Sequence, residues 1–211
     1  MTQHFPGRYR IDPADPRAPS MEEWERMTPA QRADVVAMLP GEEKLELWPP
    51  EGDEHRKAKT KATDTLDAFF KRIGRKIYVS SELGVFYPNE PRFAPDILAV
   101  LDVELHSRTK WVVANEGKGL DLVIEVHHLG SAEKDYEENV RRYARLGIHE
   151  YFLFDRGKLS LRGFRLPRGR AGAYKPILPQ QGRYASEVLG LELAVEGEKL
   201  RFLYGQAAIL E

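Results

Sequence analysis

Apolar residues recur with two different periods along the chain, and each period predicts a different element. Over residues 54–73 they return every three or four positions, which predicts an amphipathic helix that ends at Gly74. The apolar side of this helix consists of Ala58, Ala62, Leu66, Phe69 and Phe70. Between residues 131 and 146 a second long helix is expected, with Gly147 after its last turn.

Two shorter helices are predicted near the beginning of the chain. Ser20 is a suitable N-cap for a helix over MEEWERM, and Thr28 before Pro29 marks the start of another over QRADVVAML. Residues 1–19 are rich in proline and charge, which predicts an extended arm. A single domain over residues 20–211 is expected to follow it.

Apolar runs and strict alternation predict the strands. EKLELW (43–48) alternates, KIYVS and GVFY are interpreted as a pair of strands, and further strands are expected over 95–102, 120–127 and 150–155. LSLRGFRL, AYKPIL, the LGLEL region and KLRFLY are expected to form β-hairpins. This order predicts an α/β (α+β) fold, with a mixed central sheet flanked by helices and additional C-terminal β-hairpins.

Composition restricts the classes of function. The chain has 211 residues, no cysteine and a net charge of −1, which excludes disulfides, zinc–thiolate sites and thiol nucleophiles and gives no overall sign of nucleic-acid binding. GxSxG, HExxH and Gly-rich phosphate loops are absent from the sequence. No apolar stretch approaches the ~18 residues of a membrane span, and the first residues lack the apolar core of a signal peptide. A soluble cytoplasmic protein is therefore expected.

Glu125 is the unusual residue of the strand over 120–127. Asp121, Val123, Glu125 and His127 share one face of that strand. An ionised carboxylate in a core strand costs several kcal/mol unless something compensates it, and a metal ion is one adequate compensation. If the strand headed by Pro95-Asp96 is its neighbour, the carboxylates of Asp96 and Glu125 reach one divalent cation. Oxygen ligands, including the backbone carbonyl of Val126, suit Mg²⁺ or Mn²⁺.

Three segments together resemble a known family. "APDILAV", "LDLVIEV" and "EKDYEENVRRYARLGIHEYFLFD" are similar to the restriction endonuclease family of the Uma type, within the PD-(D/E)xK nuclease superfamily, over residues 41–165. The resemblance implies a restriction-endonuclease-like fold, magnesium-dependent phosphodiester hydrolysis, Asp96 and Glu125 as metal ligands, and a cytoplasmic location in bacteria. The expected partner is a nucleic acid, with DNA favoured.

The chain departs from this pattern at the catalytic lysine. The superfamily places a lysine two residues after the glutamate, where this chain has His127, and the family's other lysine position corresponds to Asn139. His127 as base or cation, Lys134 from the first turn of the following helix, and Arg142 from a later turn are the three candidates to replace it. His127 is favoured.

Structural roles remain open for the same residues. Glu125 could pair with an arginine, Asp96 could belong to a turn, and His127 could be an inert histidine. For His55 and Glu46 a structural role is favoured over a peripheral place in the site, and His128 is expected on the opposite face. The crowding of cations at Arg56, Lys57 and Lys59 is costly at the start of a helix, and a phosphate contact would explain it. The stretch RGFRLPRGR (162–170) is a second basic candidate.

Two functions follow from these observations. The first is a metal-dependent endonuclease with an altered active site. The second is a catalytically degenerate protein of the same fold that binds nucleic acid or another protein, and the missing lysine is its main support. The apolar C-terminal segment LRFLYGQAAIL is compatible with a homodimer interface and equally with completion of the core.

Overall fold

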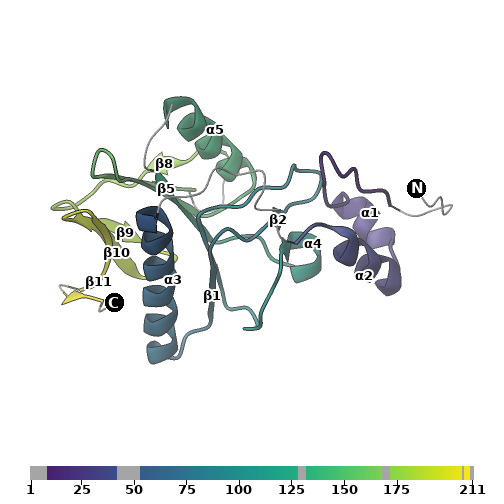
Figure 1. Ribbon diagram of the computed structural model, residues 1–211, viewed down its shortest axis with the longest axis horizontal. Helices are drawn as coiled ribbons and strands as arrows, with labels where there is room; N and C mark the ends of the chain where they lie inside the picture. Colours follow the sequence, from purple (N-terminus) through teal and green to yellow (C-terminus); the bar gives the residue numbers. More distant parts are fainter. Residues whose placement is uncertain (1–8, 42–52, 128–131, 168–171, 206, 210–211) are drawn as a thin grey trace. The chain divides into compact units, whose positions relative to one another are not determined.

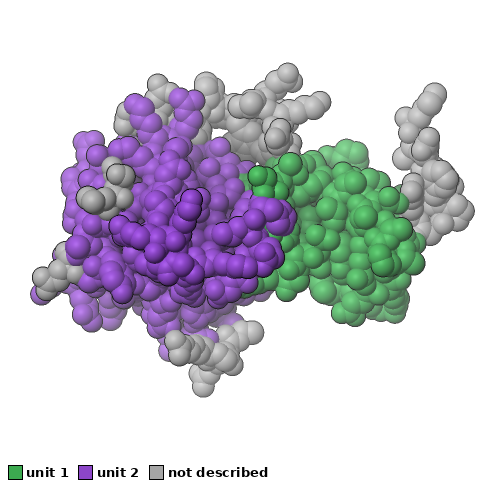
Figure 2. All heavy atoms as spheres, turned by 90° about the horizontal axis from the view of Figure 1, so that it is seen from below, with its two compact units in different colours: residues 1–48, 83–94, 107–119 green, residues 49–82, 95–106, 120–211 purple. Residues whose placement is uncertain are grey.

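The computed structural model describes residues 9–41, 53–127, 132–167, 172–205 and 207–209. The chain divides into two compact units, coloured separately in Figure 2. Unit 1 comprises residues 1–48, 83–94 and 107–119, and unit 2 comprises residues 49–82, 95–106 and 120–211. The strand expected over 43–48 lies outside the described residues. The expected arm over 1–19 and single domain over 20–211 stay predictions.

Unit 1 contains the two short helices that the sequence predicts. α1 (Met21–Arg26) begins after Ser20 and α2 (Pro29–Met38) begins after Thr28, and both cap residues form a reciprocal capping box. The remaining elements are β2 (Val85–Phe86), β4 (Trp111–Val112) and α4 (Val113–Glu116), and the two strands pair in parallel. A small apolar core forms around Ala18, Trp24, Val35, Leu39, Phe86 and Val112.

Unit 2 contains two sheets (Figure 1). The larger has the order β1-β3-β5-β6-β7-β8, and only its β5–β6 pair is parallel. Its strands are β1 (Ile77–Ser80), β3 (Ile97–Leu101), β5 (Leu122–His127), β6 (Glu150–Asp155), β7 (Ser160–Arg165) and β8 (Lys175–Pro176). The smaller sheet, β12-β11-β10-β9, is antiparallel and consists of β9 (Tyr184–Ser186), β10 (Leu191–Glu196), β11 (Lys199–Tyr204) and β12 (Ala207–Ala208). The predicted mixed sheet with C-terminal antiparallel strands is confirmed.

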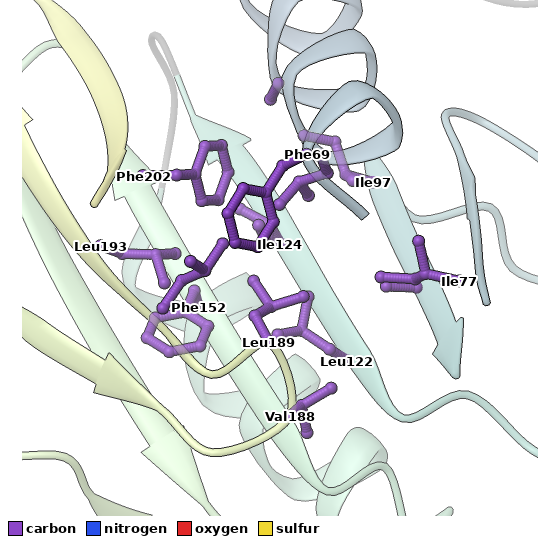
Figure 3. Close-up of a cluster of buried hydrophobic side chains, with 14 of the residues drawn as sticks. Phe69, Ile77, Ile97, Leu122, Ile124, Phe152, Val188, Leu189, Leu193 and Phe202 are labelled. Atoms are coloured by element: carbon purple, nitrogen blue, oxygen red, sulfur yellow. The ribbon is translucent and has the colours of Figure 1, made fainter. Parts of the chain in front are cut away.

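Two helices cover opposite faces of the larger sheet. α3 (Asp53–Ile73) packs its apolar side against Leu122, Ile124 and Val126 of β5, and the smaller sheet completes this core. In Figure 3, Phe69 of α3 lies close to Ile124, with Phe202 and Leu193 of the smaller sheet beside them. Each fully buried Leu, Ile or Phe side chain of this kind contributes about 1.5–3 kcal/mol. No described helix is long and apolar enough to cross a membrane.

α5 (Ala132–Arg145) covers the other face and connects the parallel strands β5 and β6. The ring of its Tyr143 lies edge-on to Tyr151 of β6 at 5.1 Å between centroids. Tyr151 alternates along β6 with Phe152, which belongs to the core under α3, so the two rings lie on the opposite face. Parallel strands require such a crossover connection.

The predicted pairing of KIYVS with GVFY is wrong. β1 pairs with β3, with Ile77 opposite Leu101, whereas β2 pairs with β4. The chain leaves β1 through Glu82, whose φ of 54° is left-handed, and the Glu82 N–H donates to the carbonyl of Pro95 at 3.0 Å. This hydrogen bond extends the contact between the end of β1 and the segment before β3, so the Glu82 N–H is not available to a hairpin between β1 and β2.

The register of β3 against β5 determines which side chains meet. The pair is antiparallel, with Ile97 opposite Ile124 and Leu98 opposite Val123. One step further along the same register places Asp96 opposite Glu125. The neighbouring-strand condition for the predicted carboxylate pair is therefore confirmed.

Candidate active site

Asp96 and Glu125 meet where the β3–β5 ladder ends. The backbone N–H of Asp96 donates to Glu125 Oε2 at 3.1 Å, and the backbone N–H of Val126 donates to Asp96 Oδ2 at 2.7 Å. Each carboxylate thus accepts a backbone hydrogen bond from the opposite strand and takes the place of a backbone acceptor. These bonds hold both side chains in fixed positions.

The two carboxylates repel each other in a buried setting. Burial raises the pKa of Glu125 to about 8, and the negative charge of Asp96 is the second cause. Hydrogen bonds from Tyr143 and from the Asp96 backbone act in the opposite direction, and they do not offset the burial. Like charges directly opposite on neighbouring strands are destabilising, so the pair favours a proton or a cation between its members.

Tyr143 reaches Glu125 from α5. Its hydroxyl donates to Glu125 Oε1 at 2.6 Å, and the ring is buried. Burial, followed by the charge of Glu125, raises the pKa of Tyr143 well above its usual range, so this hydroxyl stays a donor. Asn139, the residue at the second lysine position that the family resemblance implies, is half-buried and lies one helical turn before Tyr143 on α5.

Lys59 supplies a cation that the sequence reasoning did not assign to the site. Its side chain is 3% exposed, its Nζ lies 3.6 Å from Asp96 Oδ1, and it also forms an ion pair with Glu82. The signal was present in the sequence: Lys59 precedes Ala62 by three residues and Leu66 by seven, which places it on the buried stripe of α3. A lysine on such a stripe needs acidic partners.

The structure describes the side chains of only some of the other predicted residues. His127 is half-buried at the end of β5, on the same face as Glu125 by strand alternation, and its carbonyl accepts the Arg156 N–H at 2.8 Å. Arg142 is half-buried on α5. Lys134 belongs to the first turn of α5 and His55 to that of α3, but the side chains of both lie outside the described part of the structure, as do Glu46 and His128 entirely.

The donor set fits a hard divalent cation with few protein ligands. Among the described residues no group of three or more His, Asp or Glu side chains could hold a metal, so the oxygens available are the two carboxylates and the carbonyl of Val126. In an extended strand one residue directs its N–H and C=O to the same edge, and the Val126 N–H points to Asp96. Mg²⁺ is typically bound through one or two carboxylates while it keeps several waters.

Two comparisons with known proteins found similar proteins. The family model Uma2, described as "Putative restriction endonuclease", matches residues 21–196. The chain belongs to the Uma2 family. A solved structure, a "putative nuclease belonging to DUF820" from Anabaena variabilis ATCC 29413, is similar to this Uma2 member with a TM-score of 0.50 and 13% identity, over 67% of this chain and 76% of that chain. At that identity the likeness shows the fold alone. No curated protein matches the chain. Membership in the family supports a nuclease function in general terms.

Proposed function

We propose that this Uma2 member is a metal-dependent endonuclease whose site is the Asp96–Glu125 pair. The observation that carries the proposal is the opposition of two partly buried carboxylates at the end of the β3–β5 ladder, with the pKa of Glu125 raised to about 8. Perturbed acidic groups that converge in this way are typical of functional sites. Asp96, Glu125 and the carbonyl of Val126 would hold Mg²⁺ or Mn²⁺.

The residues around the pair have separate tasks in hydrolysis of a phosphodiester. A bound divalent cation would activate a water and stabilise charge on the phosphate. Tyr143 orients Glu125 through its hydroxyl, because that hydrogen bond fixes one carboxylate oxygen. Lys59 places a positive charge beside Asp96, where it can stabilise charge that develops on the scissile phosphate. Lys59 thereby joins His127, Lys134 and Arg142 as a candidate for the electrostatic role of the absent lysine.

Cleavage of plasmid DNA with Mg²⁺ or Mn²⁺ tests this proposal. Glu125→Gln and Asp96→Asn should each reduce the cleavage rate by about 10²-fold or more, since each removes charge that acts on the transition state. Asp102→Asn and Glu104→Gln are matched controls, because these side chains are 67% and 82% exposed. Both controls should cut like the wild type.

The degenerate alternative has a distinct outcome in the same experiment. Measurable metal binding without cleavage under any metal would favour a binding module that retains the carboxylates. Cleavage that is equally fast in Glu125→Gln and in the wild type would reject the site itself. Nucleic acid as substrate, with DNA preferred, and assembly as a homodimer are part of the proposal and are tested by the choice of substrate and by sedimentation.

A further inference from the structure

A basic cleft lies in unit 2, on the side of the larger sheet that α3 covers. Its volume is about 290 Å³, and its walls come from α3, from the ends of β5 and β6, and from β11. Among the residues that the structure describes, five cations line it, Lys57, Lys61, Arg156, Lys199 and Arg201, together with one acidic residue, Glu198. Val126 also lines it, and the Val126 N–H holds Asp96, so the cleft and the carboxylate pair share a residue.

Four of these cations form two pairs, one on α3 and one on β11. Lys57 and Lys61 are one turn apart on α3, and such like-charged neighbours destabilise a helix. Lys199 and Arg201 alternate along β11 and therefore share a face. Two pairs of cations from different elements thus line one space, and their positive potential favours an anion there.

Arg156 gives a second and independent indication of an anion. Its Nη1 atom is buried, and it has no hydrogen-bond partner in the part of the chain that the structure describes. A buried charged donor without an acceptor is costly. Its backbone N–H is held by the His127 carbonyl at 2.8 Å, which fixes the residue at the end of β6. Guanidinium groups match the oxygens of phosphate geometrically.

We propose that this cleft binds backbone phosphate of the nucleic-acid strand whose scissile bond lies at the Asp96–Glu125 pair. The inference rests on the proposed function, and it adds the path of the nucleic-acid strand, which runs from the carboxylate pair past Val126 toward β11. A water occupies about 30 Å³ of liquid, so a space of 290 Å³ holds about ten water-sized groups, enough for a phosphate with part of its sugar. Lys57 and Lys61 lie on one wall of the cleft, and the guanidinium group of Arg156 can donate two hydrogen bonds to one phosphate.

Binding of fluorescently labelled duplex DNA, measured by anisotropy in EDTA over a range of salt concentrations, tests the cleft. Lys61→Met/Arg156→Met should weaken binding at least about tenfold at low salt. It should also reduce the slope of log K against log[salt] by about 2, because each lost phosphate contact contributes about 0.9. The matched control is Arg141→Met/Lys175→Met, which removes the same two residue types from exposed positions on α5 and β8.

Further measurements keep the result interpretable. Lys57→Met/Lys61→Met changes only exposed side chains, so it should reproduce the loss without a change in thermal stability. Equal binding by the cleft variants and the wild type, or an equal loss in the control pair, would overturn the inference. Competition by poly-glutamate as effective as competition by unlabelled DNA would also overturn it and would indicate an acidic protein partner.

The two proposals fail separately. Because binding is measured in EDTA, it does not depend on cleavage. A protein that binds DNA through the cleft but cuts with no metal would keep the cleft and reject the endonuclease. A protein that cuts, and whose Lys61→Met/Arg156→Met variant binds and cuts like the wild type, would keep the endonuclease and reject the cleft.

Discussion

At the scale of single residues, two glutamates of the larger sheet show why a carboxylate in a core strand does not identify a site by itself. Glu150 is fully buried on β6, where it accepts hydrogen bonds from Arg165 Nε at 2.7 Å and from the Glu187 N–H at 2.8 Å. Its charge is compensated by an arginine, the structural role that the sequence left open for Glu125. Glu125 instead faces another carboxylate and a tyrosine. The identity of the partner separates the structural carboxylate from the candidate ligand.

Lys59 allows a sharp test at this scale. Lys59→Met should lower the cleavage rate by about 10²–10³-fold, since removal of one positioned electrostatic group has effects of that size. Binding of Mn²⁺, followed by titration calorimetry, should persist because both carboxylates remain. His127→Gln and Lys134→Met, assayed in parallel, assign the role among the candidates. A wild-type rate in Lys59→Met would remove Lys59 from the mechanism.

At the scale of elements, segments with a clear period or a helix cap were predictable, whereas the shortest strand and some strand pairings were not. The helices over Asp53–Ile73 and Ala132–Arg145 and the strands over 150–155 and 199–204 agree with the sequence pattern. β4 has two residues, too few to show a period. β2 lies within the predicted strand GVFY, but its pairing with β4 and that of β1 with β3 depended on a turn at Glu82 that the sequence pattern does not indicate.

Part of the candidate site was predictable from the sequence and part was not. Asp96 and Glu125 were predictable, because strand alternation and adjacency bring them together. Lys59 and Tyr143 come from helices that are distant in sequence, and their arrival at the site follows from packing on opposite faces of the sheet.

The contacts of Glu150 predict how much the joined strands depend on its partner Arg165. It links β6 to Arg165 of β7 and to Ser186 of β9, so it ties the two sheets of unit 2 together. Arg165→Met should reduce the free energy of unfolding by about 3–5 kcal/mol, the usual cost of leaving a buried charge without its partner. Urea denaturation measures this loss. Arg162→Met, on the same strand but with an exposed side chain, should change stability by less than about 0.5 kcal/mol.

At the scale of the whole molecule, every described residue assigned to the site belongs to unit 2. Asp96, Glu125, Tyr143 and Lys59 all lie in it, and so do the cations of the basic cleft. The chemistry therefore depends on the stability of that unit, and a ligand that binds its native state should stabilise it.

Metal addition gives the corresponding prediction. Saturation with Mn²⁺ at about 100 times its Kd adds about 2.7 kcal/mol to the stability of the native state. For a chain of this length each kcal/mol raises the Tm by roughly 2–4 °C. The wild type should therefore show a Tm increase of several degrees in calorimetry that EDTA reverses. Asp96→Asn should show little or no increase, and an equal increase in that variant would place the metal elsewhere.

The register of β3 against β5 has a consequence for how activity can be lost. A slip of one position would exchange Glu125 with its apolar neighbours and send a carboxylate into the layer beneath α3. Chains that form the native sheet therefore have the two acids opposite each other, and chains with a shifted register are less stable. In descendants of this sequence, the proposed catalysis can be lost through replacement of individual side chains while the sheet that aligns them is kept.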